Sequence, residues 1–136
     1  MPTDVGVIGL GTVGGEVAKR LHCRQQRLER RTGSTVRLKA VAEPQVRPEL
    51  EELVDSVDYY EDADELINEG SVDVLVELIG GLSPAEEIVS RALENGLDVV
   101  TANKELLAHR GEDLFNLAAD YDQRIRFEAA VGGCIP

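Results

Sequence analysis

The stretch that decides the fold is Val5-Gly-Val-Ile-Gly-Leu-Gly-Thr-Val-Gly14. It begins as a short apolar run that ends at Gly9, which is typical of a buried strand. A helical pattern follows from about Thr12 to Arg30. Three apolar residues recur on one face of this helix, namely Val13, Val17 and Leu21. A strand that runs through Gly-x-Gly-x-x-Gly into a helix predicts the first unit of a dinucleotide-binding fold.

Strand-like and helix-like segments alternate along the rest of the chain. Strands are expected at residues 36–43, 72–78, 97–101 and 124–127, and helices at 62–69, 84–95 and 104–121, the last with a break near Gly111. Residues 44–58 carry two prolines and several acidic residues, and no element is predicted there. The alternation predicts an α/β fold: a Rossmann-type, doubly wound parallel sheet in three layers, with residues 1–136 forming a single domain.

Two of the expected helices carry recognisable start signals. Asp62 and Glu65 have the spacing of a capping box. Ser83 is expected at the N-cap position of the next helix, with Pro84 in its first turn and Glu86 at the third position.

The charge and hydropathy of the chain exclude several classes of function. The formal net charge is −12, so nucleic acid phosphates would be repelled. No run approaches the roughly 18 apolar residues of a membrane span, and the polar start Met1-Pro-Thr-Asp4 does not resemble a signal peptide. We therefore expect a cytoplasmic protein that binds neither nucleic acid nor a membrane.

The cysteines and histidines form no metal-binding pattern. Cys23 and Cys134 lie far apart and neither belongs to a CxxC or CxxH pattern, which fits a reducing compartment rather than a disulfide scaffold or a zinc ribbon. His22 and His109 are expected to be exposed helix residues. The acidic clusters are interpreted as solvated faces and helix caps.

Each glycine of the loop has a distinct predicted role. Gly9 permits the tight turn, Gly11 lets the backbone approach a pyrophosphate, and Gly14 lets the helix pack against the strand. The whole loop, including Leu10, Thr12 and Val13, would hold a diphosphate at the helix N-terminus. The alternative is a glycine-rich turn that binds no ligand.

The acidic residue expected to hold the adenosine ribose is Glu43, at the end of the second strand. A carboxylate at this position accepts hydrogen bonds from the 2′-hydroxyl and repels a 2′-phosphate, which favours NAD over NADP. Arg47 lies close enough in sequence to contact a phosphate instead, so NADP stays open as the alternative cofactor. Glu43 could also be a solvated acid at a strand end.

Four segments of the chain resemble homoserine dehydrogenase. They are Gly9-Leu-Gly-Thr-Val-Gly14, Val76-Glu-Leu-Ile-Gly-Gly81, Val99-Val-Thr-Ala-Asn-Lys104 and Phe127-Glu-Ala-Ala-Val-Gly-Gly-Cys-Ile-Pro136. The resemblance implies the NAD(P)-binding domain of an oxidoreductase that interconverts L-homoserine and L-aspartate 4-semialdehyde, on the way to threonine, methionine and isoleucine. It also implies that a substrate-binding and dimerising domain is absent from this chain, which alone would bind cofactor without being active.

The resemblance further implies a set of site residues along the cofactor. These are Ile79, Gly80, Gly81, Thr101, Ala102, Asn103, Lys104, Gly132 and Cys134. Lys104 is the expected catalytic residue, because hydride transfer at the hydroxyl-bearing carbon requires an acid or base for the hydroxyl proton. A solvated lysine at a helix start is the alternative.

The last segment adds a metal site and a departure from the family. In some members its counterpart holds a sodium ion through main-chain carbonyls, and the matching positions are Glu128, Val131, Gly133 and Ile135. Cys134 stands where the family usually has glycine, and its side chain could crowd the nicotinamide. It is interpreted as a small buried residue, with a redox thiol as the alternative.

Two other interpretations stay open from the sequence. One is a domain of an aspartate-dehydrogenase-like amino-acid dehydrogenase, and the other is a free-standing NAD(P)-sensing regulatory module. The family is homo-oligomeric, but the resemblance attributes most of its dimer contacts to the domain absent here, so the oligomeric state of this chain stays open.

Overall fold

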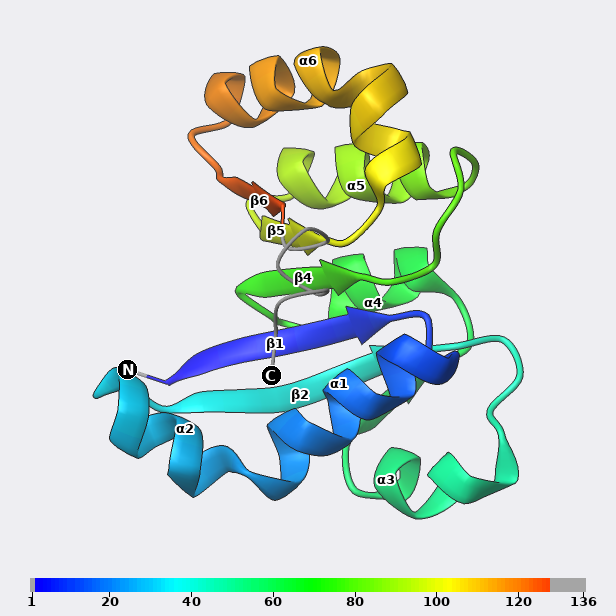
Figure 1. The fold of residues 1–136 in the computed structure, drawn as a ribbon, viewed down its shortest axis with the longest axis vertical. Helices are drawn as coiled ribbons and strands as arrows, with labels where there is room; N and C mark the ends of the chain where they lie inside the picture. The colour runs from blue at the N-terminus through cyan, green and yellow to red at the C-terminus, as the bar shows by residue number, and fades with distance from the viewer. Residues whose placement is uncertain (1, 128–136) are drawn as a thin grey trace.

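The computed structural model describes residues 2–127 and shows a six-stranded parallel sheet with helices on both faces (Figure 1). The strand order is β3-β2-β1-β4-β5-β6, and every pair of neighbouring strands is parallel. This is the strand order of the doubly wound dinucleotide-binding fold. The predicted fold class is therefore confirmed.

The elements have the following bounds. The strands are β1 (Thr3–Ile8), β2 (Val36–Ala42), β3 (Asp58–Tyr60), β4 (Val74–Glu77), β5 (Asp98–Thr101) and β6 (Ile125–Phe127). The helices are α1 (Thr12–Cys23), α2 (Gln25–Thr32), α3 (Glu51–Asp55), α4 (Ala63–Glu69), α5 (Ala85–Glu94) and α6 (Lys104–Asp120), with a 3₁₀ turn η1 (Pro48–Leu50) before α3.

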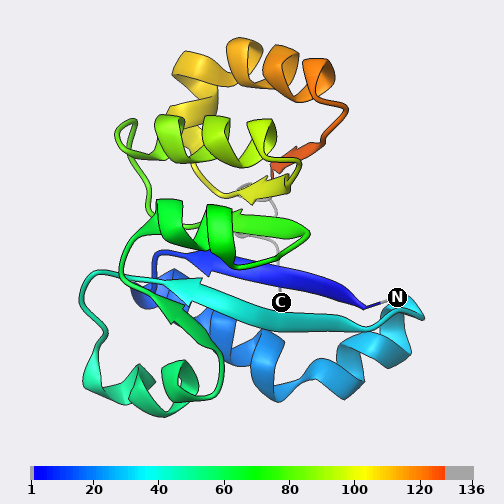
Figure 2. The ribbon, with the colours of Figure 1, turned by 180° about the vertical axis from the view of Figure 1, so that it is seen from behind.

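Alternating side chains of the strands divide the core into two layers. On one face, α1, η1 and α3 pack against the strands through a cluster that includes Val7, Ala18 and Leu50. On the other face, α4, α5 and α6 pack through a cluster that includes Leu66 and Leu93. In Figure 1, α1 lies in front of β1 and β2, and from behind α4 lies in front of the sheet (Figure 2). The sheet is thus the middle layer of three, with one apolar cluster between it and the helices on each face, as the alternation predicted.

The stretch without predicted elements, residues 44–58, contains η1 and α3 and the first residue of β3. β3 is a three-residue strand, Asp58-Tyr-Tyr60, at one edge of the sheet. Its side chains are exposed or half-buried, so the stretch has no apolar period that would mark it.

The first predicted helix is wrong in two respects. It does not run unbroken from Thr12 to Arg30, because it is interrupted at Arg24, which separates α1 from α2. Val13 does not face the core, since 61% of it is exposed. The buried positions of α1 are small residues, Gly14, Gly15 and Ala18, which bring the helix axis close to the sheet.

Two further boundary predictions are corrected. Ser83 does not cap α5, which begins at Ala85 with Pro84 at the N-cap position and no side-chain cap. The break expected near Gly111 does not occur, because α6 is continuous from Lys104 to Asp120 with Gly111 buried. A single glycine inside a helix costs only about 1 kcal/mol relative to alanine, so it need not interrupt the helix.

The predicted cap of α4 is confirmed, since the Asp62 carboxylate accepts a hydrogen bond from the Asp64 N–H at 3.0 Å. We expect Asp62→Ala to lower the free energy of unfolding by about 1 kcal/mol, because this N–H loses its partner. Chemical denaturation monitored by circular dichroism measures the change. Glu61→Ala is the matched control, since it removes the same charge one residue earlier without removing the cap. Equal losses in both variants would contradict the capping role.

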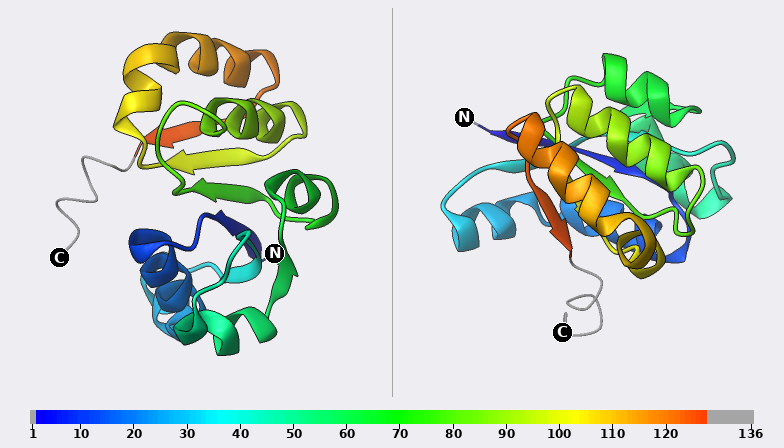
Figure 3. Two further views of the ribbon diagram at one scale, coloured as in Figure 1. Left: turned by 90° about the vertical axis from the view of Figure 1, so that its right-hand side faces the viewer. Right: turned by 90° about the horizontal axis from the view of Figure 1, so that it is seen from above.

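The topology places the functional edge of the sheet. The strand order reverses between β1 and β4, because β2 and β3 lie on one side of β1 while β5 and β6 lie beyond β4. Ligands of open α/β sheets bind at the carboxyl ends of the strands at this reversal. The loops after β1, β2, β4 and β5 are therefore the candidate site, and the left view of Figure 3 turns this edge of the sheet toward the viewer.

Candidate functional site

The glycine loop turns the chain sharply from β1 into α1. Gly9 has a φ of +94°, a conformation that favours glycine, and a Cβ there would lie 3.0 Å from the Leu78 backbone. A Cβ on Gly14 would overlap the carbonyl oxygen of Gly9. The predicted roles of Gly9 in the turn and Gly14 in close packing are thus confirmed. A Cβ on Gly11 would meet nothing within 4 Å, so this position faces open space that a ligand can approach.

Two side chains from the loop after β2 hold the glycine loop. Oε1 of Glu43 accepts a hydrogen bond from the Leu10 N–H at 2.8 Å. Nη2 of Arg47 donates to the carbonyl oxygens of Gly11 at 2.9 Å and Leu10 at 3.4 Å. Glu43 and Arg47, the two predicted determinants of cofactor choice, therefore both shape the loop itself.

A cavity of about 510 Å³ opens beside the glycine loop. Gly9 and Gly11 line it, together with Glu43 at the end of β2 and Ile79 in the loop after β4. Its rim carries the carboxylates Glu43, Glu61, Asp62, Asp64 and Glu87. The basic residue that lines it, Arg91, is paired with Asp64 at 2.6 Å. The cavity is thus strongly anionic and is bounded by backbone at the glycine loop.

The Tyr59 side chain lies near two of these carboxylates, Glu43 and Glu61. Its hydroxyl donates a hydrogen bond of 2.6 Å to the backbone carbonyl oxygen of Glu43. Desolvation first, and then the negative charges of Glu61 and Glu43, raise the pKa of the Tyr59 phenol. The two carboxylates thus add to an effect that desolvation dominates.

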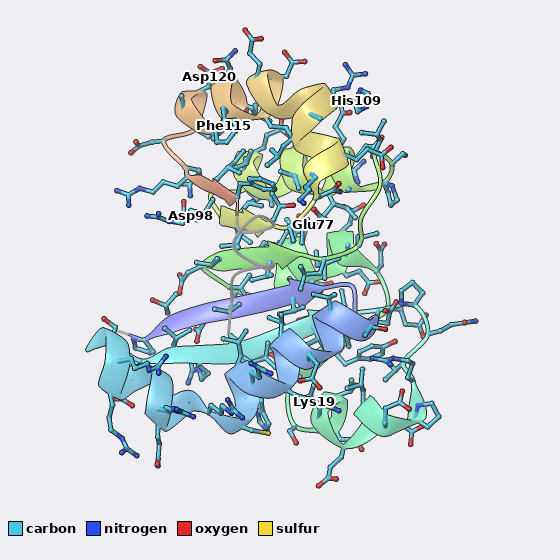
Figure 4. All side chains as sticks on the ribbon, viewed as in Figure 1. Lys19, Glu77, Asp98, His109, Phe115 and Asp120 are labelled. Carbon is cyan, nitrogen blue, oxygen red and sulfur yellow. The ribbon has the colours of Figure 1, made fainter. Side chains whose placement is uncertain are left out.

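A second cluster of polar groups lies at the ends of β4 and β5. Glu77 is fully buried, and its Oε2 accepts hydrogen bonds from the N–H groups of Ile79 at 2.9 Å and Gly80 at 3.1 Å. Its Oε1 accepts a hydrogen bond from the Thr101 hydroxyl at 2.6 Å. Figure 4 labels Glu77 in the interior, on the β4 side below α6. This cluster joins the ends of two strands through Glu77 and Thr101, which are 24 residues apart in sequence.

The sequence analysis missed Glu77 as a functional residue. The residue was part of the quoted Val76–Gly81 string, but it was given no role of its own. The available signal was an acidic residue at the carboxyl end of an otherwise apolar strand, where burial is costly unless hydrogen bonds compensate.

Lys104 is the first residue of α6 and is exposed. The Asn103 side chain caps this helix by accepting a hydrogen bond from the Leu106 N–H at 3.0 Å. A cation at a helix N-terminus opposes the helix dipole, so local stability does not explain a lysine here. Its place at the carboxyl edge of β5 is the one expected for a group that meets substrate.

The structure brings the predicted site residues together in two groups. Gly9, Gly11, Glu43 and Ile79 line the cavity, whereas Thr101 to Lys104 lie beyond β4, at the end of β5. The positions predicted from the last segment lie outside the described residues: Gly132 and Cys134 at the nicotinamide, and Glu128, Val131, Gly133 and Ile135 at sodium. The sodium site stays a prediction.

The edge of the sheet has the features that a dinucleotide requires. The first-turn N–H groups of α1 have no intrahelical partners and no side-chain cap, and they lie beside the open space at Gly11. On the other side of the strand reversal, Gly80 and Gly81 have φ values of +84° and +74°, and a Cβ on either would meet nothing within 4 Å. Backbone is thus open to a ligand on both halves of the edge.

The remaining predicted features can be checked within residues 2–127. Cys23 is a free, exposed cysteine, and His22 and His109 are exposed helix residues, as expected. In this part of the chain, no group of three or more His, Cys, Asp or Glu side chains is placed to hold a metal ion. No helix described here combines the length and apolar character needed to cross a bilayer.

A family model described as the NAD-binding domain of homoserine dehydrogenase matches residues 9–128. The chain is 41% identical over 135 residues to homoserine dehydrogenase from Neisseria gonorrhoeae. This match covers 99% of the chain and 31% of the relative. It is 38% identical over 135 residues to the Pseudomonas aeruginosa enzyme, with the same coverage of 99% and 31%. The chain thus spans less than a third of the length of these curated relatives.

Solved structures agree in fold. A homoserine dehydrogenase from Thiobacillus denitrificans superposes with a TM-score of 0.84 at 37% identity, covering 96% of this chain and 30% of that one. A hyperthermophilic archaeal homoserine dehydrogenase in complex with NADPH superposes with a TM-score of 0.75 at 24% identity, covering 96% and 44%. The second likeness concerns the fold alone.

Proposed function

The chain belongs to the family of homoserine dehydrogenase NAD-binding domains, and we propose on that basis that it binds a nicotinamide dinucleotide along the carboxyl edge of its sheet. The observation that carries the proposal is the close packing of the glycine loop, in which a Cβ on Gly14 would overlap the Gly9 carbonyl. Gly11, just before α1, faces open space and lines a cavity of about 510 Å³. The diphosphate would lie at that helix start, with the adenosine in the cavity.

The same family supports a proposal for the activity of the longer protein. Within it, this domain would take part in the interconversion of L-homoserine and L-aspartate 4-semialdehyde. The relatives described above carry this name, which favours the activity over an aspartate-dehydrogenase-like enzyme or a regulatory module. Since the chain spans 31% of those relatives, we expect it to bind cofactor but not to turn over substrate alone.

The bound nicotinamide supplies the hydride acceptor or donor. The residues of this chain would position it and move a proton. Oxidation of the homoserine hydroxyl requires that its proton leave, and Lys104 at the start of α6 would accept it in that direction and return it in the other. The substrate would then lie near the carboxyl end of β5, where the exposed Lys104 begins α6.

The acidic cavity supports a preference for NAD over NADP. Glu43 at the end of β2 lies beside Glu61, and a 2′-phosphate there would meet carboxylates. Arg47 is not among the described residues that line the cavity, and its guanidinium is engaged by the Gly11 carbonyl and lies 3.4 Å from Glu49.

Calorimetric titration of the chain with NADH and with NADPH tests both proposals. We expect saturable binding with NADH at least about tenfold tighter, since one uncompensated charge contact is worth on the order of 1 kcal/mol or more near the surface. Glu43→Gln should narrow the preference several-fold, because glutamine still accepts from the Leu10 N–H but no longer repels a phosphate. Glu94→Gln, at the exposed end of α5, is the matched control for charge.

Each outcome of the titration has a separate meaning. Absence of binding for both nucleotides would overturn the proposed function. Tighter binding of NADPH than of NADH would overturn only the cofactor preference. Arg47 would then be the expected contact of the 2′-phosphate.

A further inference from the structure

Glu77 is the charged side chain that the described part of the fold buries completely. It is the last residue of β4, paired in register with Ile8 of β1 and Thr101 of β5. A carboxylate removed from water is costly unless hydrogen bonds replace its hydration. Here three hydrogen bonds replace that hydration, and an apolar residue at this position could not make them.

The two oxygens of Glu77 serve two different loops. Oε2 accepts from two successive N–H groups, those of Ile79 and Gly80, in the loop after β4. Oε1 accepts from the Thr101 hydroxyl at the end of β5. The side chain therefore fixes the position of one loop relative to the other.

The hydrogen bonds continue into a closed circuit. Oγ1 of Thr101 accepts from the Asn103 N–H at 3.0 Å, and Nδ2 of Asn103 donates to the Gly81 carbonyl oxygen at 2.6 Å. The backbone from Gly81 to Glu77 completes the ring. Since Asn103 also caps α6, the circuit fixes the first turn of the helix that carries Lys104.

Glu77 also determines what the loop after β4 can bind. Successive backbone N–H groups form an anion-binding concavity, and here the Glu77 carboxylate already occupies the N–H groups of Ile79 and Gly80. The loop therefore offers the other half of the ligand the open backbone surfaces at Gly80 and Gly81, not a phosphate site, while the Ile79 side chain lines the cavity assigned to the adenosine. An uncharged, planar group suits these surfaces better than a phosphate does.

We propose that the Glu77 carboxylate is a positioning residue for the nicotinamide half of the dinucleotide, acting through the loops after β4 and β5. The inference rests on the proposed cofactor binding. In the doubly wound fold the adenosine half lies over β1 and β2, so the nicotinamide half lies over β4 and β5, whose ends Glu77 joins. Glu77 contributes to affinity for that half and not for the ADP-ribose half.

Titration with NADH and with ADP-ribose, which lacks the nicotinamide, tests the inference. We expect the parent chain to bind NADH more tightly than ADP-ribose. Glu77→Gln should weaken NADH binding by about tenfold, because the amide cannot accept on both sides, and should leave ADP-ribose affinity unchanged. The chain has no Trp, so the fluorescence of bound NADH gives a clean second signal from the reduced ring, and its change on binding should be lost in the variant.

Two further variants keep the inference falsifiable. Thr101→Val removes one hydroxyl while Glu77 keeps its contacts with Ile79 and Gly80, so it should show a smaller effect of the same kind even if Glu77→Gln does not fold. Glu105→Gln makes the same charge change at an exposed position in the first turn of α6 and should change neither affinity.

The outcomes separate the inference from the proposed function. Equal parent affinities for NADH and ADP-ribose, or an equal loss of both in folded Glu77→Gln or Thr101→Val, would overturn the role of Glu77 and leave cofactor binding intact. Failure of the parent chain to bind either ligand would overturn the proposed function itself.

Discussion

Replacing Gly14 with alanine is expected to abolish measurable binding of NADH. The new Cβ would overlap the carbonyl oxygen of Gly9 and lie 2.8 Å from its carbonyl carbon. Both are backbone atoms, and Gly9 is itself held against the Leu78 backbone, so the turn has to move as a whole. Because the N–H groups at the start of α1 would then point away from the diphosphate, we expect a loss of about 100-fold or more in affinity.

The matched control for Gly14→Ala is Gly11→Ala. A Cβ on Gly11 meets nothing within 4 Å, and its φ of −71° suits any residue. The stability of Gly11→Ala should therefore equal that of the parent, whereas Gly14→Ala should lose about 1–3 kcal/mol of unfolding free energy through overpacking. If Gly11→Ala weakens nucleotide binding without loss of stability, the ligand approaches Gly11 as predicted. Parent-like NADH affinity in folded Gly14→Ala would contradict the proposed position of the diphosphate.

Replacing Lys104 is expected to produce the largest effect on activity. The experiment uses a chimera in which this chain replaces the matched 135 residues of the Neisseria gonorrhoeae relative, so that the remainder of that enzyme is present. Lys104→Met should lower kcat for homoserine oxidation by about 10²–10⁴-fold, the usual contribution of a general acid or base. Binding of NADH should change little, because the diphosphate and adenosine contacts lie on the other half of the edge.

The other lysines of the chain provide controls for this experiment. Lys19 lies within α1, and Lys39 of β2 is paired with Asp58 at 3.3 Å, so neither is placed at the carboxyl edge. Lys19→Met and Lys39→Met should leave kcat near that of the parent chimera. A kcat of Lys104→Met within a few-fold of these controls would show that another group moves the proton.

Much of the architecture followed from local pattern. The apolar runs and the glycine and proline signals between them located five of the six strands, and the capping pattern at Asp62 located α4. β3 was not predicted because its three residues at the sheet edge are exposed or half-buried and show no alternation of apolar and polar side chains. The interruption of the helix at Arg24 was also not predicted, because no glycine or proline marks it.

The candidate site was predicted less evenly. The glycine loop was recognised from the spacing of its glycines between a strand and a helix, and Glu43 from its place at the end of the second strand. The resemblance to a known family added Lys104 and its neighbours. Glu77 was overlooked because an acidic residue within a strand is ambiguous until its burial is known. The network it forms joins Gly81 to Asn103, and no sequence interval specifies such a pairing.

The sequence by itself identified the family that the chain belongs to, five of the six strands, and the tight turn at Gly9 and Gly14. The strands and the turn depend on contacts between residues that are close in the chain, because periodicity and glycine conformation reflect the local energetics directly. Only the tertiary structure decided that Glu43 and Arg47 both hold the glycine loop, and that Glu77 links the ends of β4 and β5. Those hydrogen bonds depend on which parallel strands become neighbours and in what register, and that is settled by packing both faces of the sheet at once.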